Sequence, residues 1–205
     1  MLTLIRSGFG ISPSLAAKAA VAAIVTTAVA GVSLIGGDQR SGLFPTLMAV
    51  AAACLMLCTF GVLARHQPGP QRSMVVGGLW VAACFAAVSV AFAAIGVGDL
   101  LGIEEDSAGI LAWIPVSAMG LAVLTFPAAQ AVLAFGVQRS RVRPRWGSVA
   151  VWTLVPLVPL TLILAGVVDG AAENWVPAVM LSIIVMLWGV VGQSLRIATK
   201  SPGGS

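Results

Sequence analysis

The residues best placed to do chemistry are a glutamine and a threonine inside a long apolar stretch. Gln130 and Thr125 lie within residues 109–137, and Pro127 lies between them. A proline inside a helix removes one internal hydrogen bond and frees a carbonyl. Such groups can bind a neutral solute at the middle of a membrane. A simple kink with a hydrogen bond between helices explains the same residues, because proline is common in membrane helices.

A second pair of prolines lies in the next apolar stretch. Pro156 and Pro159 fall within residues 146–168, between Thr153 and Thr161. If the two stretches pack together, their prolines interrupt neighbouring helices and the freed polar groups share one region. The candidate substrate or packing site then consists of Gln130, Thr125, Pro127, Pro156 and Pro159.

Two charged segments offer other chemistry. The acidic loop over residues 99–106 contains Asp99, Glu104, Glu105 and Asp106. Its oxygens could contact a divalent cation, but consecutive carboxylates cannot all face one ion, and EF-hand spacing is absent. A solvated acidic loop is the simpler interpretation.

The basic segment 138–145 contains Arg139, Arg141, Arg143 and Arg145, followed by Trp146. Its arginines could bind anionic lipid headgroups at the cytoplasmic face. A signal for membrane orientation is the simpler interpretation, because this is the commonest use of such a loop.

Groups typical of enzymes and pumps are missing from the apolar stretches. None has an Asp, Glu, Arg or His at its middle, and His66 is the only histidine. Proton relays and ion-coupled transporters use such residues. We therefore expect no catalytic residue, no metal and no cofactor, and the sequence weighs against an enzyme without excluding one. The three cysteines, Cys54, Cys58 and Cys84, are expected to be small buried hydrophobes without a disulfide.

The elements that position these residues are predicted to be membrane helices. Of 205 residues, 59% are hydrophobic and only 9% are charged, whereas soluble domains carry about a quarter as charges. A crossing needs about 20 apolar residues. Six stretches qualify and predict one all-α membrane domain over residues 1–205, a six-helix bundle with spans near 16–36, 44–64, 74–101, 109–137, 146–168 and 175–195.

Charge predicts the orientation of this bundle. Basic and acidic connections alternate, and Lys and Arg in short loops mark the cytoplasmic side. The predicted inner bases are Arg6, Lys18, Arg65, Arg72, Arg139, Arg141, Arg143, Arg145, Arg196 and Lys200, and the predicted outer acids are Asp38, Asp99, Glu104, Glu105, Asp106, Asp169 and Glu173. Only Arg40 breaks the pattern. Both termini are then cytoplasmic, and the composition suggests a bacterial inner membrane. A cleaved signal over residues 1–30 is the alternative for the N-terminus.

Three functions are compatible with this pattern. The first is a non-catalytic membrane protein that packs against lipid, a protein partner or another copy of itself. The second is a small transporter or channel for a neutral or lipid-like solute, with its site at the fourth and fifth stretches. The third is a lipid-modifying enzyme, and it ranks last because the sequence offers no catalytic groups for it. Nucleic acid is not an expected partner, because the net charge of +4 reflects orientation.

The orientation is directly testable. A topology reporter inserted within residues 99–106 should be placed outside the cytoplasm, because the acidic segment lies opposite the arginine-rich one. A reporter within 138–145 is the matched control and should be cytoplasmic. A cytoplasmic signal from 99–106 would overturn the predicted topology.

Overall fold

The computed structural model describes residues 13–35, 43–65, 72–102, 105–139, 149–157, 160, 182–191 and 193. Four long helices are α2 (Pro13–Ile35), α3 (Leu43–Arg65), α4 (Arg72–Leu101) and α5 (Glu105–Arg139). Two shorter helical pieces cover residues 149–157 and Ser182–Val191. The described part of the chain is helical apart from the turn at Gly102, which confirms the all-α prediction there.

Each of the four long helices matches a predicted span and is long and apolar enough to cross a membrane. The first four predicted stretches, 16–36, 44–64, 74–101 and 109–137, correspond to α2, α3, α4 and α5. Only parts of the fifth and sixth stretches belong to the described residues. The chain therefore has the architecture of a helical membrane protein, and the count of six crossings stays a prediction.

The connection between α4 and α5 is shorter than the predicted acidic loop. Asp99 lies in the last turn of α4, and Glu105 and Asp106 lie in the first turn of α5. Gly102 ends α4 with a positive φ of 65°, and its N–H donates to the Asp99 carbonyl at 3.2 Å. Glycine takes this left-handed conformation without steric cost, and acidic residues suit a helix N-terminus. The loop prediction over 99–106 was therefore too long.

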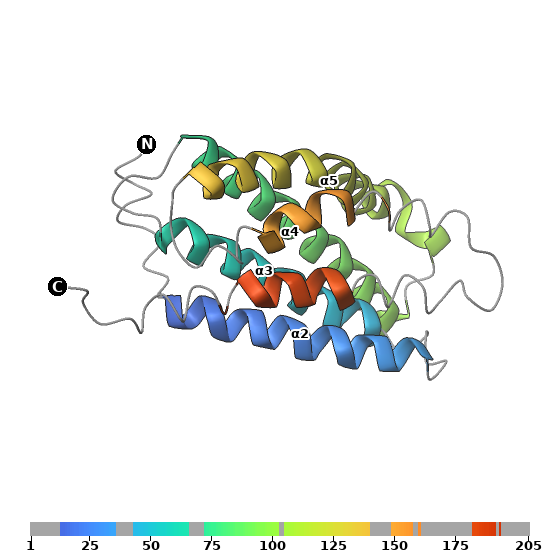
Figure 1. Ribbon diagram of the computed structural model, residues 1–205. Helices are drawn as coiled ribbons and strands as arrows, with labels where there is room; N and C mark the ends of the chain where they lie inside the picture. Colours follow the sequence, from blue (N-terminus) through green and yellow to red (C-terminus); the bar gives the residue numbers. More distant parts are fainter. Residues whose placement is uncertain are drawn as a thin grey trace.

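Consecutive helices alternate in direction and pack in sequence order, α2 on α3, α3 on α4 and α4 on α5 (Figure 1). This alternation brings the helix ends that share a charge to the same end of the bundle. One end carries Arg65, Arg72 and Arg139, and the opposite end carries Asp99, Glu105 and Asp106. We call these the basic end and the acidic end.

Glycine sets the spacing of α4 and α5 near the basic end. A Cβ built on Gly77 would meet the backbone of Leu133, and one built on Gly136 would lie 2.5 Å from Met74 Cα. Real side-chain carbons do not approach so closely, so only glycine permits this backbone contact. Each helix thus contributes one glycine to a close backbone contact with the other helix.

The 182–191 helix lies against three long helices. Trp188 is fully buried, and its ring packs on Phe85 of α4 with centroids 5.4 Å apart. Its carbonyl lies 3.9 Å from the Cys58 Sγ of α3. A Cβ on Gly189 would collide with the Ile24 side chain of α2. This helix, red in Figure 1, therefore completes the core beside α3 and α4.

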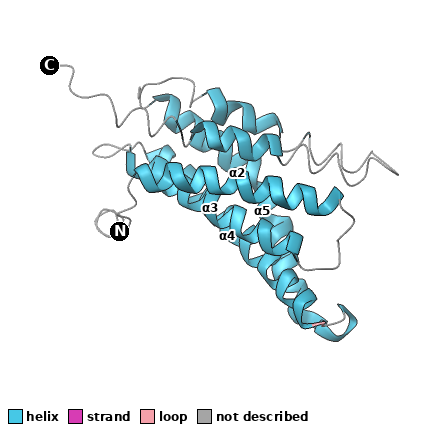
Figure 2. Ribbon diagram, turned by 90° about the horizontal axis from the view of Figure 1, so that it is seen from below, coloured by secondary structure: helices cyan, strands magenta, loops and turns pink. Residues whose placement is uncertain are grey.

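The α4–α5 pair extends beyond the packing of the other described helices. Its 30 and 35 residues span about 45 Å and 52 Å at 1.5 Å per residue, more than the hydrocarbon thickness. Figure 2 shows the pair running diagonally away from α2 toward the turn at Gly102. Near that turn Leu101 is 68% exposed and Trp113 is 70% exposed. No other described helix covers this apolar part of the pair.

The glycine contact generates a stability prediction. Gly136→Ala should lower the free energy of unfolding by about 1–3 kcal/mol, because the added methyl meets Met74 backbone that no rotamer change can move. Gly120→Ala on the same helix is the control, since a Cβ there meets nothing within 4 Å. Thermal unfolding in detergent measures both. Equal melting temperatures for the two variants would contradict the proposed close contact.

Candidate functional site

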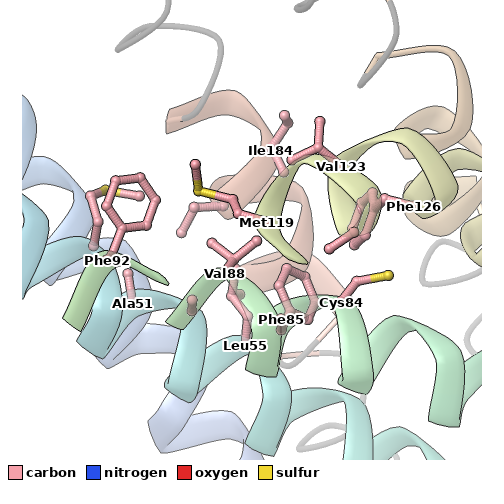
Figure 3. A pocket seen from close by; sticks show the side chains of 14 residues that line it. Ala51, Leu55, Cys84, Phe85, Val88, Phe92, Met119, Val123, Phe126 and Ile184 are labelled. Atoms are coloured by element: carbon pink, nitrogen blue, oxygen red, sulfur yellow. The ribbon is translucent and has the colours of Figure 1, made fainter. Parts of the chain in front are cut away.

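A cavity of about 250 Å³ lies among α3, α4, α5 and the 182–191 helix (Figure 3). Its walls are apolar, and it is not fully enclosed. The side chains that define its shape are Leu55 of α3, Phe85 and Phe92 of α4, Met119 and Phe126 of α5, and Ile184. A dry apolar space of this kind accepts hydrocarbon rather than water, which needs several polar partners.

Aromatic rings close the cavity toward the basic end. Phe85 and Phe126 meet edge to face with centroids 5.2 Å apart, and Trp188 packs behind Phe85. We call Phe85 and Phe126 the aromatic wall. At the other end of the cavity Phe92 packs edge to face on Phe44, with centroids 6.2 Å apart. The space is thus bounded at both ends by rigid rings in favourable geometry.

Met119 reaches into the middle of the cavity. Figure 3 shows its thioether chain between Phe92 and the side chains of Val123 and Ile184. Methionine has three rotatable bonds and adapts to irregular partners. The cavity therefore combines rigid ends with one adaptable side chain, which suits an apolar guest of variable shape.

Polar side chains close to the cavity make hydrogen bonds that keep them out of it. Ser89 Oγ donates to the Ala49 carbonyl at 2.9 Å and ties α4 to α3. Thr125 Oγ1 donates to the Leu121 carbonyl of its own helix at 2.9 Å and lies 3.8 Å from Cys84 Sγ. These groups are satisfied inside the protein, and the wall of the cavity remains apolar.

Gln130 is buried without a hydrogen-bond partner. Its side chain is 0% exposed, and neither amide atom has a partner among the described residues. The indole Nε1 of Trp188 is unpartnered in the same sense. Buried donors and acceptors left unpaired cost about 1–3 kcal/mol each. Among the described residues, these three side-chain atoms are therefore unusual in being buried without a hydrogen bond.

The structure does not join Gln130 and Thr125 into one polar cluster. The two residues are five positions apart on α5, or about 140° around the helix axis. Thr125 faces Cys84 of α4, whereas Gln130 follows Phe126 by one turn and shares its face. Two residues that sequence reasoning placed together thus lie on different faces.

Pro127 lies inside α5 and does not end it. The helix continues from Glu105 to Arg139 with Pro115 and Pro127 inside it. A membrane helix tolerates single prolines when neighbouring helices hold it in place. Pro156 lies within the 149–157 helix and is exposed, and Pro159 lies outside the described residues.

The 149–157 helix packs beside the basic end of α5. Val151 and Leu154 are buried in the same core as Leu133. The indole Nε1 of Trp152 donates to Gln138 Oε1 at 3.1 Å. The described part of the fifth apolar stretch therefore packs beside the fourth, and the contacts shown are packing and one hydrogen bond.

The charged candidates are only partly described. Arg139 places its guanidinium carbon 4.7 Å from the Phe135 ring centroid, a cation–π contact. Arg141, Arg143, Arg145 and Glu104 lie outside the described residues. Asp99 is exposed, and among the described residues no group of three His, Cys, Asp or Glu could hold a metal ion.

No protein-family model, no curated protein and no solved structure matches this chain.

Proposed function

We propose that this protein is a non-catalytic membrane protein that binds a lipid-like apolar molecule in the cavity between α3, α4, α5 and the 182–191 helix. The observation that carries the proposal is the cavity itself, whose walls are apolar and three of whose four helices are long and apolar enough to cross a membrane. In this proposal a hydrocarbon chain enters the cavity from the surrounding bilayer. The ligand class is therefore a lipid chain or a small apolar molecule dissolved in the membrane.

The driving force for this binding is packing rather than escape from water. A chain that leaves the bilayer already comes from an apolar solvent, so the hydrophobic effect contributes little. Filling an empty space does contribute, because the side chains that line a void lack contact partners on that side. Phe85, Phe126 and Met119 present large surfaces for these contacts.

The proposal includes the topology predicted from charge. The protein crosses a bacterial inner membrane six times, with both termini in the cytoplasm. The separation of Arg65, Arg72 and Arg139 from the acidic residues at the opposite end of the bundle supports this orientation. The cavity then lies within the hydrocarbon, between a basic inner end and an acidic outer end.

Lipid headgroups are the proposed partners at the basic end. Arg139 is exposed, and its side chain already lies along an aromatic ring. Together with Arg141, Arg143 and Arg145 it would attract anionic headgroups. The exposed apolar surface of the α4–α5 pair leaves room for a protein partner or a second copy as well.

The transporter alternative has one observation in its favour. Gln130 is a buried amide without a partner among the described residues, and a passing neutral solute could pair with it. The apolar cavity wall favours static binding instead. The enzyme alternative gains nothing from the described residues, which hold no nucleophile beside a base.

Filling the cavity tests the proposal. Ala122→Leu places a larger side chain in the cavity wall and should reduce retained lipid or added decane at least tenfold, while the melting temperature of the ligand-free protein stays equal or rises. Ala118→Leu, one turn earlier on α5 and exposed, is the matched control and should bind like the wild type. Native mass spectrometry from mild detergent measures occupancy, and unfolding curves report stability. Equal occupancy in all three proteins would refute cavity binding.

A further inference from the structure

Three unpaired polar atoms lie just beyond the aromatic wall. Gln130 follows Phe126 by one turn of α5, on the side of the basic end. The Trp188 ring packs directly behind Phe85. Both residues are 0% exposed. The apolar cavity therefore ends at two rings, and the two rings are backed by polar groups without partners among the described residues.

Positions on the neighbouring helices show that both polar groups lie at the same end of the cavity. Leu55 lines the cavity, and Cys58, three residues further along α3, contacts the Trp188 carbonyl. Ile184 lines the cavity one turn before Trp188. Gln130 and Trp188 are thus each displaced from the cavity by one turn toward the basic end.

The three atoms define what could pair with them. Gln130 Nε2 and Trp188 Nε1 are donors, and Gln130 Oε1 is an acceptor. A hydroxyl group has two acceptor lone pairs and one donor hydrogen, so it can accept from either donor and donate to the Gln130 acceptor. A carbonyl would leave Oε1 unpaired. A carboxylate or an ammonium group would bring a charge into a region where no charged residue of α3, α4 or α5 lies.

We propose that Gln130 and Trp188 form the polar end of the ligand site and that its guest is a neutral lipid-like alcohol. The hydrocarbon chain occupies the apolar cavity, and the hydroxyl passes the edges of Phe85 and Phe126 to reach the amide and the indole. This path requires the Phe85 and Phe126 side chains to turn, a motion that side chains make without unfolding. This inference rests on the proposed cavity binding and adds the chemical class of the ligand.

Two matched probes test the inference. Decane and 1-decanol have the same chain and differ by one hydroxyl. The wild type should bind 1-decanol more tightly than decane, measured as the ligand-induced rise in melting temperature across a concentration series. Gln130→Met, which keeps the length of the side chain but removes its polar atoms, should lower the affinity for 1-decanol about tenfold and leave decane unchanged. Partitioning of each probe into detergent is the same for every variant and cancels in the comparison.

Two further variants sharpen the result. Gln138→Met makes the same change two turns further along α5, at an exposed position, and should bind both probes like the wild type. Trp188→Phe removes the indole N–H and should also weaken 1-decanol selectively. It provides a second measurement should Gln130→Met fail to fold.

The outcomes separate this inference from the proposed function. Decane binding with an unchanged preference for 1-decanol in Gln130→Met and Trp188→Phe would overturn the polar end and leave the apolar cavity standing. The same result is expected if these atoms are paired only by an internal water. Failure of the wild type to bind either probe would overturn both proposals.

Discussion

The close backbone contact between α4 and α5 is the constraint on which the packing of the other described helices depends. Gly77 and Gly136 bring the two helices together near the basic end, where no side chain separates them. Phe85 lies eight residues beyond Gly77 on α4, about 12 Å along the axis. At that level Phe85 faces Phe126 of α5, and both side chains line the cavity among α3, α4, α5 and the 182–191 helix. The close backbone contact and the cavity therefore lie at different levels of the same helix pair.

The hydrocarbon surroundings impose the second constraint, which is that polar groups find partners nearby. Most threonines of the described helices do so within their own turn: Thr27, Thr59 and Thr153 each donate to the carbonyl four residues earlier. Ser89 does so across two helices. Gln130 and Trp188 depart from this rule among the described residues. Unpaired polar atoms next to a cavity have a simple physical explanation, since a molecule bound in the cavity can supply the missing hydrogen-bond partners.

The sequence predicted the four long helices well, for physical reasons, and the candidate site of Gln130, Thr125, Pro127, Pro156 and Pro159 stays a prediction. Long apolar stretches and charged connections predicted α2 to α5 within a few residues, because hydrocarbon thickness fixes span length. The same patterns singled out Gln130, whose polarity stands out in an apolar stretch. They missed Phe85, Phe126 and Met119, because an apolar residue that lines a cavity looks like one that faces lipid or core. They also grouped Thr125 with Gln130 by proximity in the chain, whereas helical geometry places the two on different faces.

The placement of charges and the proposed ligand class both follow from the high cost of placing a charge in the middle of an apolar bundle. Each charged residue of α3, α4 and α5 lies within the first or last turn of its helix, as Arg72 and Asp99 do on α4. The middle of the bundle therefore offers a guest dispersion contacts and a few neutral hydrogen bonds, and no ion pair. Neutral hydrogen bonds discriminate between an alcohol and an alkane, because an unmatched amide is left buried when the hydroxyl is absent. A core of this kind can select a neutral lipid by its single polar group, while the apolar cavity walls contact the hydrocarbon chain without recognising any one position along it.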